Sequence, residues 1–130
     1  MQKANTLLLL ALFFFFRPSP LFAQSHEVHF KSGTQVFPEN ATEITRQPKP
    51  DPQEVFQDIY YRYLQFEEIP RQSQREQLER SGIGLLDYIP NNTYLAAIPQ
   101  NYDLAQLAAY GLRSIVPVMP LHKIDPLLSG

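Results

Sequence analysis

The positions of proline and glycine divide residues 54–119 into six short segments, and this division constrains the fold more than any other feature. The segments between these breaks differ in their hydrophobic period, which predicts strand, helix, strand, strand, helix and strand in that order. We expect strands at 59–68, 85–89, 93–98 and 113–119, and helices at 71–81 and 102–110. Mixed elements in one small unit predict an α+β domain.

Local signals support the helix limits. Ser73 and Glu76 fit a capping box, Glu76 and Arg80 are spaced as an i,i+4 ion pair, and Gly82 is a C-terminal cap. Asn101 is placed to cap the second helix, which Gly111 ends.

Asn91 and Asn92 tolerate the left-handed conformation, so residues 90–92 are expected to form a hairpin turn. The hairpin joins two βαβ halves, which predicts a ferredoxin-like βαββαβ arrangement with a four-stranded antiparallel sheet. Right-handed crossovers fix the strand order as 4-1-3-2, with two helices on one face. Pro117 then falls in an edge strand, where a missing N–H is tolerated.

Both faces of this sheet carry apolar or aromatic side chains. In the first strand, Tyr61, Tyr63 and Gln65 alternate with Arg62, Leu64 and Phe66. Because two helices cover only one face, the other is a candidate surface for docking a protein. The alternative is that these tyrosines are ordinary half-exposed strand residues.

The first 23 residues have the order of a secretory signal peptide. Lys3 precedes an apolar run at 7–16, and Pro18 and Pro20 break that run before the small residue Ala23. Ten helical residues rise about 15 Å, half of a bilayer core of about 30 Å. We therefore expect cleavage after Ala23, an exported chain and no stable membrane anchor.

The exported chain divides into four parts. Residues 24–37 are expected to form an N-terminal strand or hairpin segment, and 38–53 a proline-rich linker. Residues 54–119 form the domain, and 120–130 an extended C-terminal connector.

Composition argues against several classes of function. The chain has 11 Lys and Arg against 13 Asp and Glu, which leaves no basic excess for nucleic acid. Zero Cys excludes disulfides and thiolate chemistry. His26 and His29 point to opposite faces of a strand and are not expected to share a metal. We expect no catalytic residue, metal or cofactor within the 130 residues.

One family resemblance emerges from an ordered set of short segments. The segments are YLQF at 63–66, QREQL at 74–78 with Gly82-Ile83, and LLDYIPNNTYL at 85–95, and the start FKSG at 30–33 is also similar. The set resembles the N-terminal pro-region of exported bacterial subtilisin-like serine peptidases over residues 27–120.

The resemblance implies a role in folding and inhibition. Such pro-regions pack an exposed sheet face on the catalytic domain, in cis or in trans, as intramolecular chaperone and inhibitor. It suggests five interface residues here, namely Tyr61, Tyr63, Gln65, Tyr88 and Tyr94. The three sequence motifs of the peptidase itself are absent, so we expect either a fragment of a longer serine endopeptidase precursor or a free-standing inhibitor. The abrupt, apolar C-terminus at 124–128 favours the fragment.

The sequence leaves two alternatives open. The first is a free-standing exported peptidase inhibitor or protein-binding module of the same fold. The second is an unrelated exported protein that binds a small ligand or a cell-envelope partner.

Overall fold

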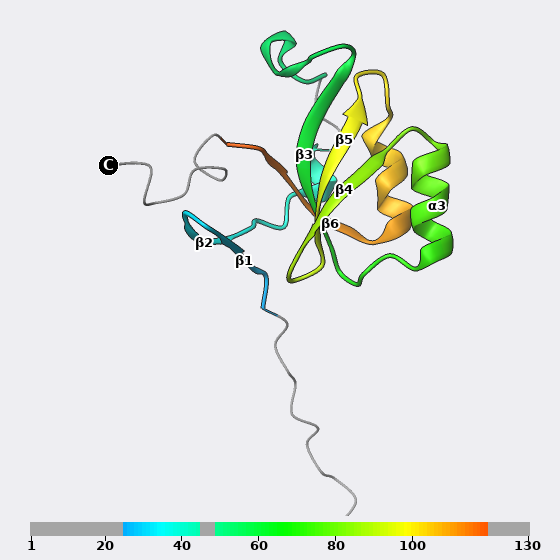
Figure 1. Ribbon diagram of the computed structural model, residues 1–130. Coiled ribbons are helices and arrows are strands. Elements are labelled where there is room, and N and C mark those ends of the chain that lie inside the picture. Colours follow the sequence, from blue (N-terminus) through cyan, green and yellow to red (C-terminus); the bar gives the residue numbers. More distant parts are fainter. Residues whose placement is uncertain (1–24, 45–48, 120–130) are drawn as a thin grey trace, which may run out of the picture.

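The computed structural model describes residues 25–44 and 49–119, which form an α+β protein with two antiparallel sheets (Figure 1). The expected signal peptide (1–23) and C-terminal connector (120–130) lie outside the described residues. The elements in chain order are β1 (Glu27–Phe30), β2 (Gly33–Val36), α2 (Ala41–Ile44), η2 (Pro52–Glu54), β3 (Ile59–Phe66), α3 (Gln72–Arg80), β4 (Gly84–Ile89), β5 (Thr93–Pro99), η3 (Leu104–Tyr110) and β6 (Leu112–Pro117), where η marks a 3₁₀ helix.

The larger sheet has four antiparallel strands in the order β4-β5-β3-β6. The first and third strands of the six-segment pattern, β3 and β5, are therefore central, as the sequence predicts. Pro117 ends the edge strand β6. The turn between β4 and β5 is also as predicted, because Asn91 and Asn92 have φ of 69° and 57°.

The helices differ from expectation in their ends. At the start of α3, the N–H of Arg71 donates to Gln74 Oε1 at 2.8 Å, so Gln74 rather than Glu76 completes the cap. Glu76 instead forms the predicted ion pair with Arg80, at 3.7 Å. The second helix was expected to start at Tyr102, but the N–H of Tyr102 closes a turn on Pro99 O at 2.9 Å.

The second helical segment is η3, a 3₁₀ helix that begins two residues later than expected. The side chain of Asp103, not Asn101, caps it by accepting from the N–H of Ala105 at 3.0 Å. Gly111 ends it with φ of 72°, in the left-handed region that favours glycine.

α3 and η3 lie on one face of the four-stranded sheet (Figure 1). Leu78 of α3 and Leu107 of η3 are fully buried against that face. The sheet residues that complete this core are Tyr60, Leu64, Phe66, Tyr94, Ala96, Ile98, Leu112 and Ile115. This helix-covered face holds the main hydrophobic core of the domain.

The edge strand β6 is covered by a residue from far earlier in the chain. Asn40 Oδ1 accepts from the N–H of Ile115 at 2.9 Å, and Asn40 Nδ2 donates to Ile115 O at 3.0 Å. The amide thus satisfies main-chain groups that an edge strand otherwise exposes. Ala41 of α2 packs on the main core. The start of the segment expected to be a linker therefore contacts the domain.

Candidate functional site

The candidate site is the face of the four-stranded sheet opposite the helices, which we call the second face. Alternation along β3 places Tyr61, Tyr63 and Gln65 on it. In β5, Leu95 and Ala97 lie opposite Tyr63 and Tyr61, so they share this face.

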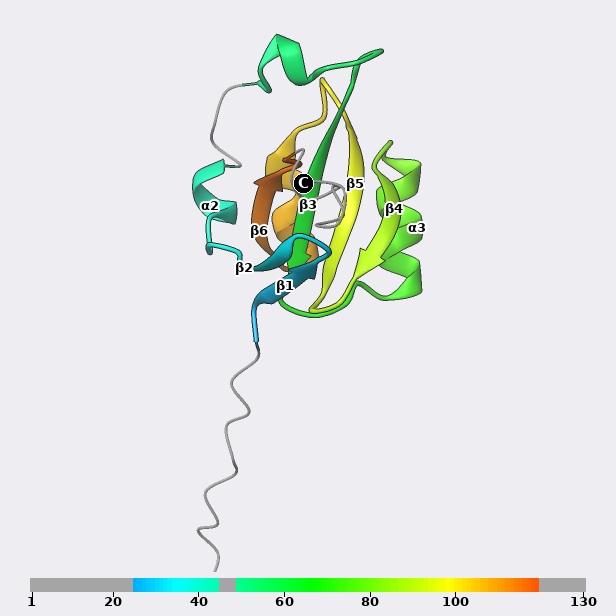
Figure 2. The same cartoon turned by 60° about the vertical axis from the view of Figure 1, so that its left-hand side comes forward.

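The β1–β2 hairpin covers one half of the second face. Val28 and Phe37 are fully buried there against Tyr63 and Val116. The Phe30 and Phe37 rings lie 5.1 and 6.0 Å from the Tyr63 ring, between centroids. Figure 2 shows the hairpin crossing β3 near one end of the sheet. These residues form a second hydrophobic core, and we call this part the covered half.

Polar contacts also attach the N-terminal segment to the sheet. Gln65 is fully buried, and its Oε1 accepts from Arg113 Nη1 at 2.9 Å. Three sheet or turn side chains donate to main-chain carbonyls of the N-terminal segment: Gln65 to His26 at 3.3 Å, Arg113 to Phe37 at 2.9 Å, and Asn91 to Glu27. The hairpin is therefore part of the folded domain.

The expectation that the second face is uncovered is thus wrong for this half. The alternating apolar residues of β1 must be buried somewhere, and the second face offers the nearest apolar surface. Two of the suggested interface residues contact the chain's own N-terminal segment: Tyr63 packs against the hairpin, and Gln65 donates to His26 just before it. Burial raises the pKa of the Tyr63 hydroxyl above its usual value.

Tyr88 and Tyr94 lie on the opposite, helix-covered side. They are directly paired across β4 and β5, with ring centroids 5.2 Å apart. Tyr94 is buried against Phe66, at 6.3 Å between ring centroids, and belongs to the main core. The five suggested residues therefore do not form one surface, and only Tyr61 is exposed on the second face.

The other half of the second face is open among the described residues. Tyr61 is 43% exposed and lies opposite Ala97, which in turn lies opposite Gly84. Leu86 is 53% exposed, and its Cδ2 lies 3.7 Å from where a Cβ on Gly84 would be. Ile59 continues the row at the start of β3. We call Ile59, Tyr61, Leu86 and Ala97 the open half.

Leu86 reaches this surface because of an irregularity in β4. The register between β4 and β5 shifts between Leu85 and Asp87, so Leu86 is an extra residue. Such a β-bulge turns a side chain out of strict alternation. The sequence predicts a regular strand here, and no turn residue marks the bulge, so Leu86 was missed as a surface residue.

Metal-ligating clusters and membrane-spanning helices are both absent from the described residues. No group of three or more His, Cys, Asp or Glu in residues 25–44 and 49–119 lies close enough to hold a metal ion. Within the same ranges, no helix has the length and apolar character needed to cross a bilayer. The most prominent feature is the open half, an apolar surface of the kind that binds proteins.

Fold and surface together define a small α+β protein with one helix-covered sheet face and a second face closed over half its area. A family model described as a domain of unknown function, DUF8729, matches residues 29–119. The chain belongs to this family. The matched region includes most of the β1–β2 hairpin together with the four-stranded sheet. No curated protein and no solved structure matches the chain.

Proposed function

We propose that this protein is a protein-binding pro-region of an exported subtilisin-like serine peptidase, which docks the open half of its sheet on the catalytic domain. In this proposal residues 59–117 form a ferredoxin-like βαββαβ unit. The β1–β2 hairpin is an addition that closes the other half of the second face. The signal peptide directs export to the periplasm, the cell surface or the medium.

The observation that carries the proposal is the open half itself. Tyr61 and Leu86 are about half exposed, although they lie on a sheet face whose other half is built as a protein interior. Surfaces that combine aromatic and aliphatic side chains in this way are typical of interface cores. A partner that covers the open half would complete the second face.

The proposed action follows from binding equilibrium. A domain that binds only the native form of the catalytic domain stabilises that form, and thereby assists its folding. The same contact inhibits the enzyme when the C-terminal connector, 120–130, lies along the cleft as an added strand. The connector's role rests on the family resemblance alone.

A free-standing exported inhibitor is the second candidate. The second core beneath the hairpin favours it, because Val28, Phe37 and Tyr63 are buried without any partner chain. A domain that completes half of its own second face depends less on a covalently joined catalytic domain.

Inhibition of a bacterial subtilisin by residues 24–130 tests the proposal, and one pair of variants tests the docking face. Tyr61 and Tyr88 are 43% and 48% exposed on opposite faces of the same sheet. We expect Tyr61→Ala to weaken inhibition by roughly thirtyfold, about 2 kcal/mol, as for an interface hot spot. Tyr88→Ala should leave the inhibition constant unchanged, because its side chain faces away from the docked enzyme.

Urea denaturation provides the stability control, since both substituted side chains are about half exposed. Equal losses of inhibition in the two variants would contradict docking through the open half. A folded wild-type domain without inhibition at micromolar concentration would contradict the pro-region proposal itself.

A further inference from the structure

The turn that precedes β3 displays the most exposed large apolar side chain of the described residues. Phe56 is 71% exposed, and it comes two residues after the short helix η2. Figure 1 shows η2 and this turn at the end of the four-stranded sheet, beyond the body of the domain.

The turn is well ordered by hydrogen bonds. Phe56 and Ile59 exchange two main-chain hydrogen bonds, of 2.8 and 3.0 Å, around the two central residues. Both central residues, Gln57 and Asp58, have positive φ, of 50° and 63°, which costs free energy for residues other than glycine. The carbonyl of Asp58 also accepts from the N–H of Gln100 at 2.8 Å.

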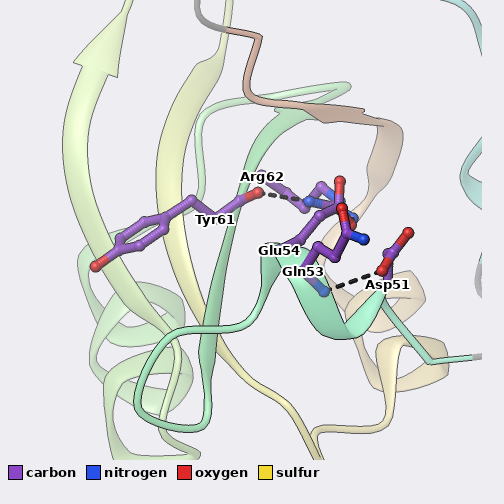
Figure 3. A network of polar contacts seen from close by, with 5 residues as sticks. All are labelled: Asp51, Gln53, Glu54, Tyr61 and Arg62. Atoms are coloured by element: carbon purple, nitrogen blue, oxygen red, sulfur yellow. Dashed lines mark hydrogen bonds and ion pairs between the residues drawn. The ribbon is translucent and has the colours of Figure 1, made fainter.

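Contacts behind the turn fix η2 to the sheet. Arg62 of β3 forms an ion pair with Glu54 at 2.6 Å (Figure 3). The side chain of Asp51 caps η2 by accepting from the N–H of Gln53 at 2.9 Å. Val55 packs against the main core. The main chain at Phe56 is therefore held in place before binding, which reduces the loss of conformational entropy on binding.

Phe56 extends the open half of the second face. It pairs with Ile59 across the turn, so the two side chains lie on the same side. Ile59 shares a face with Tyr61 by alternation along β3. The three side chains form one exposed apolar row that ends at Phe56.

The charged residue of the turn itself is acidic. Asp58 is exposed next to Phe56, whereas Lys49 and Asp51, both exposed before η2, carry opposite charges. Asp87 is exposed on the second face, opposite Leu95 and beside Leu86. An anionic lipid surface docked on this row would repel Asp58, and a second copy docked there would bring the two Asp58 side chains together. The complementary surface is apolar at its centre and basic at its rim.

We propose that Phe56 is an anchor residue that inserts into an apolar pocket rimmed by Lys or Arg on the protein that covers the open half. This inference rests on the proposed function, because the partner is the same catalytic domain. It adds a second contact region, the turn Phe56–Ile59, and a charge requirement on the partner. Asp58 supplies the electrostatic complement at the pocket rim.

Binding of residues 24–130 to a bacterial subtilisin, inactivated at its catalytic serine, tests the anchor. All described structure lies within these residues. We expect Phe56→Ala to raise Kd at least tenfold without changing the urea midpoint, and Phe56→Leu to retain most of the affinity. Ile69→Ala is the matched control, because Ile69 is 48% exposed outside the second face and should leave Kd unchanged.

The charge requirement has its own variant. Asp58→Asn removes the charge and keeps a residue that tolerates positive φ. It should slow association severalfold at low salt and weaken its dependence on ionic strength, whereas Glu68→Gln, at an exposed site beyond the far end of β3, should not. An unchanged Kd for Phe56→Ala with tight wild-type binding overturns the anchor but leaves the proposed function standing.

Other outcomes assign the turn differently. Wild-type protein that does not bind the inactivated subtilisin overturns both proposals together. Phe56-dependent flotation with anionic vesicles, or a Phe56-dependent dimer in sedimentation, overturns the anchor in favour of a lipid surface or a second copy.

Discussion

Phe66→Ala is expected to lower the free energy of unfolding by about 3–5 kcal/mol, the range for truncating a buried aromatic side chain. Phe66 is fully buried on the helix-covered face and packs edge-on against Tyr94. It also lies at the point where the register between β3 and β6 shifts. Because the total free energy of unfolding of small domains is only about 5–15 kcal/mol, the variant should be close to unfolding. Urea denaturation followed by circular dichroism measures the loss.

Tyr61→Ala is the matched control for this prediction, since Tyr61 is an aromatic residue of the same strand on the other face. Removing its exposed side chain should lower the free energy of unfolding by well under 1 kcal/mol, as is usual for surface substitutions. A large loss in Tyr61→Ala and a small one in Phe66→Ala would reverse the assignment of the two faces.

Phe37→Ala should release the β1–β2 hairpin from the covered half without unfolding the four-stranded sheet. Phe37 is fully buried between the hairpin and Tyr63, so the substitution removes about 3 kcal/mol of packing. The loss in global stability is limited to what the docked hairpin contributes, because the sheet keeps its own core beneath the helices. Hydrogen exchange of the β1–β2 amides should accelerate roughly a hundredfold.

Amides of the central strand β5 are the internal control, since their protection depends on the main core. Faster hydrogen exchange confined to the hairpin would show that the hairpin opens separately from the four-stranded sheet. Equal acceleration in β1, β2 and β5 would show that both cores unfold together, and unchanged hairpin exchange would show that Phe37 does not hold it.

The positions of proline and asparagine in the sequence predict the topology of the larger sheet. Pro117 identifies an edge strand, and Asn91-Asn92 marks the turn between β4 and β5; both features are local and appear as predicted. The predicted start of the second helix is wrong because Asp103, not Asn101, provides the cap, and the N–H of Tyr102 closes the preceding turn. Such competition between neighbouring caps is decided by a few tenths of a kcal/mol.

The candidate site was harder to predict, because it depends on contacts between distant residues. Alternation assigned Tyr61, Tyr63 and Gln65 to one face, but nothing local shows that the hairpin covers two of them. Gln65 and His26 are 39 positions apart, and Asn40 and Ile115 are 75 apart. The bulge at Leu86 also decides which residues of β4 reach the second face, and it leaves Tyr88 on the other side.

In the proposed complex the open half of the second face, and not the helix-covered face, contacts the catalytic domain. Side-chain footprinting by hydroxyl radicals, with and without inactivated subtilisin, tests it most directly, because Tyr61 and Tyr88 start from similar exposure. We expect complex formation to protect Tyr61 severalfold and to leave the labelling of Tyr88 unchanged. Protection of Tyr88 with unchanged labelling of Tyr61 would contradict it.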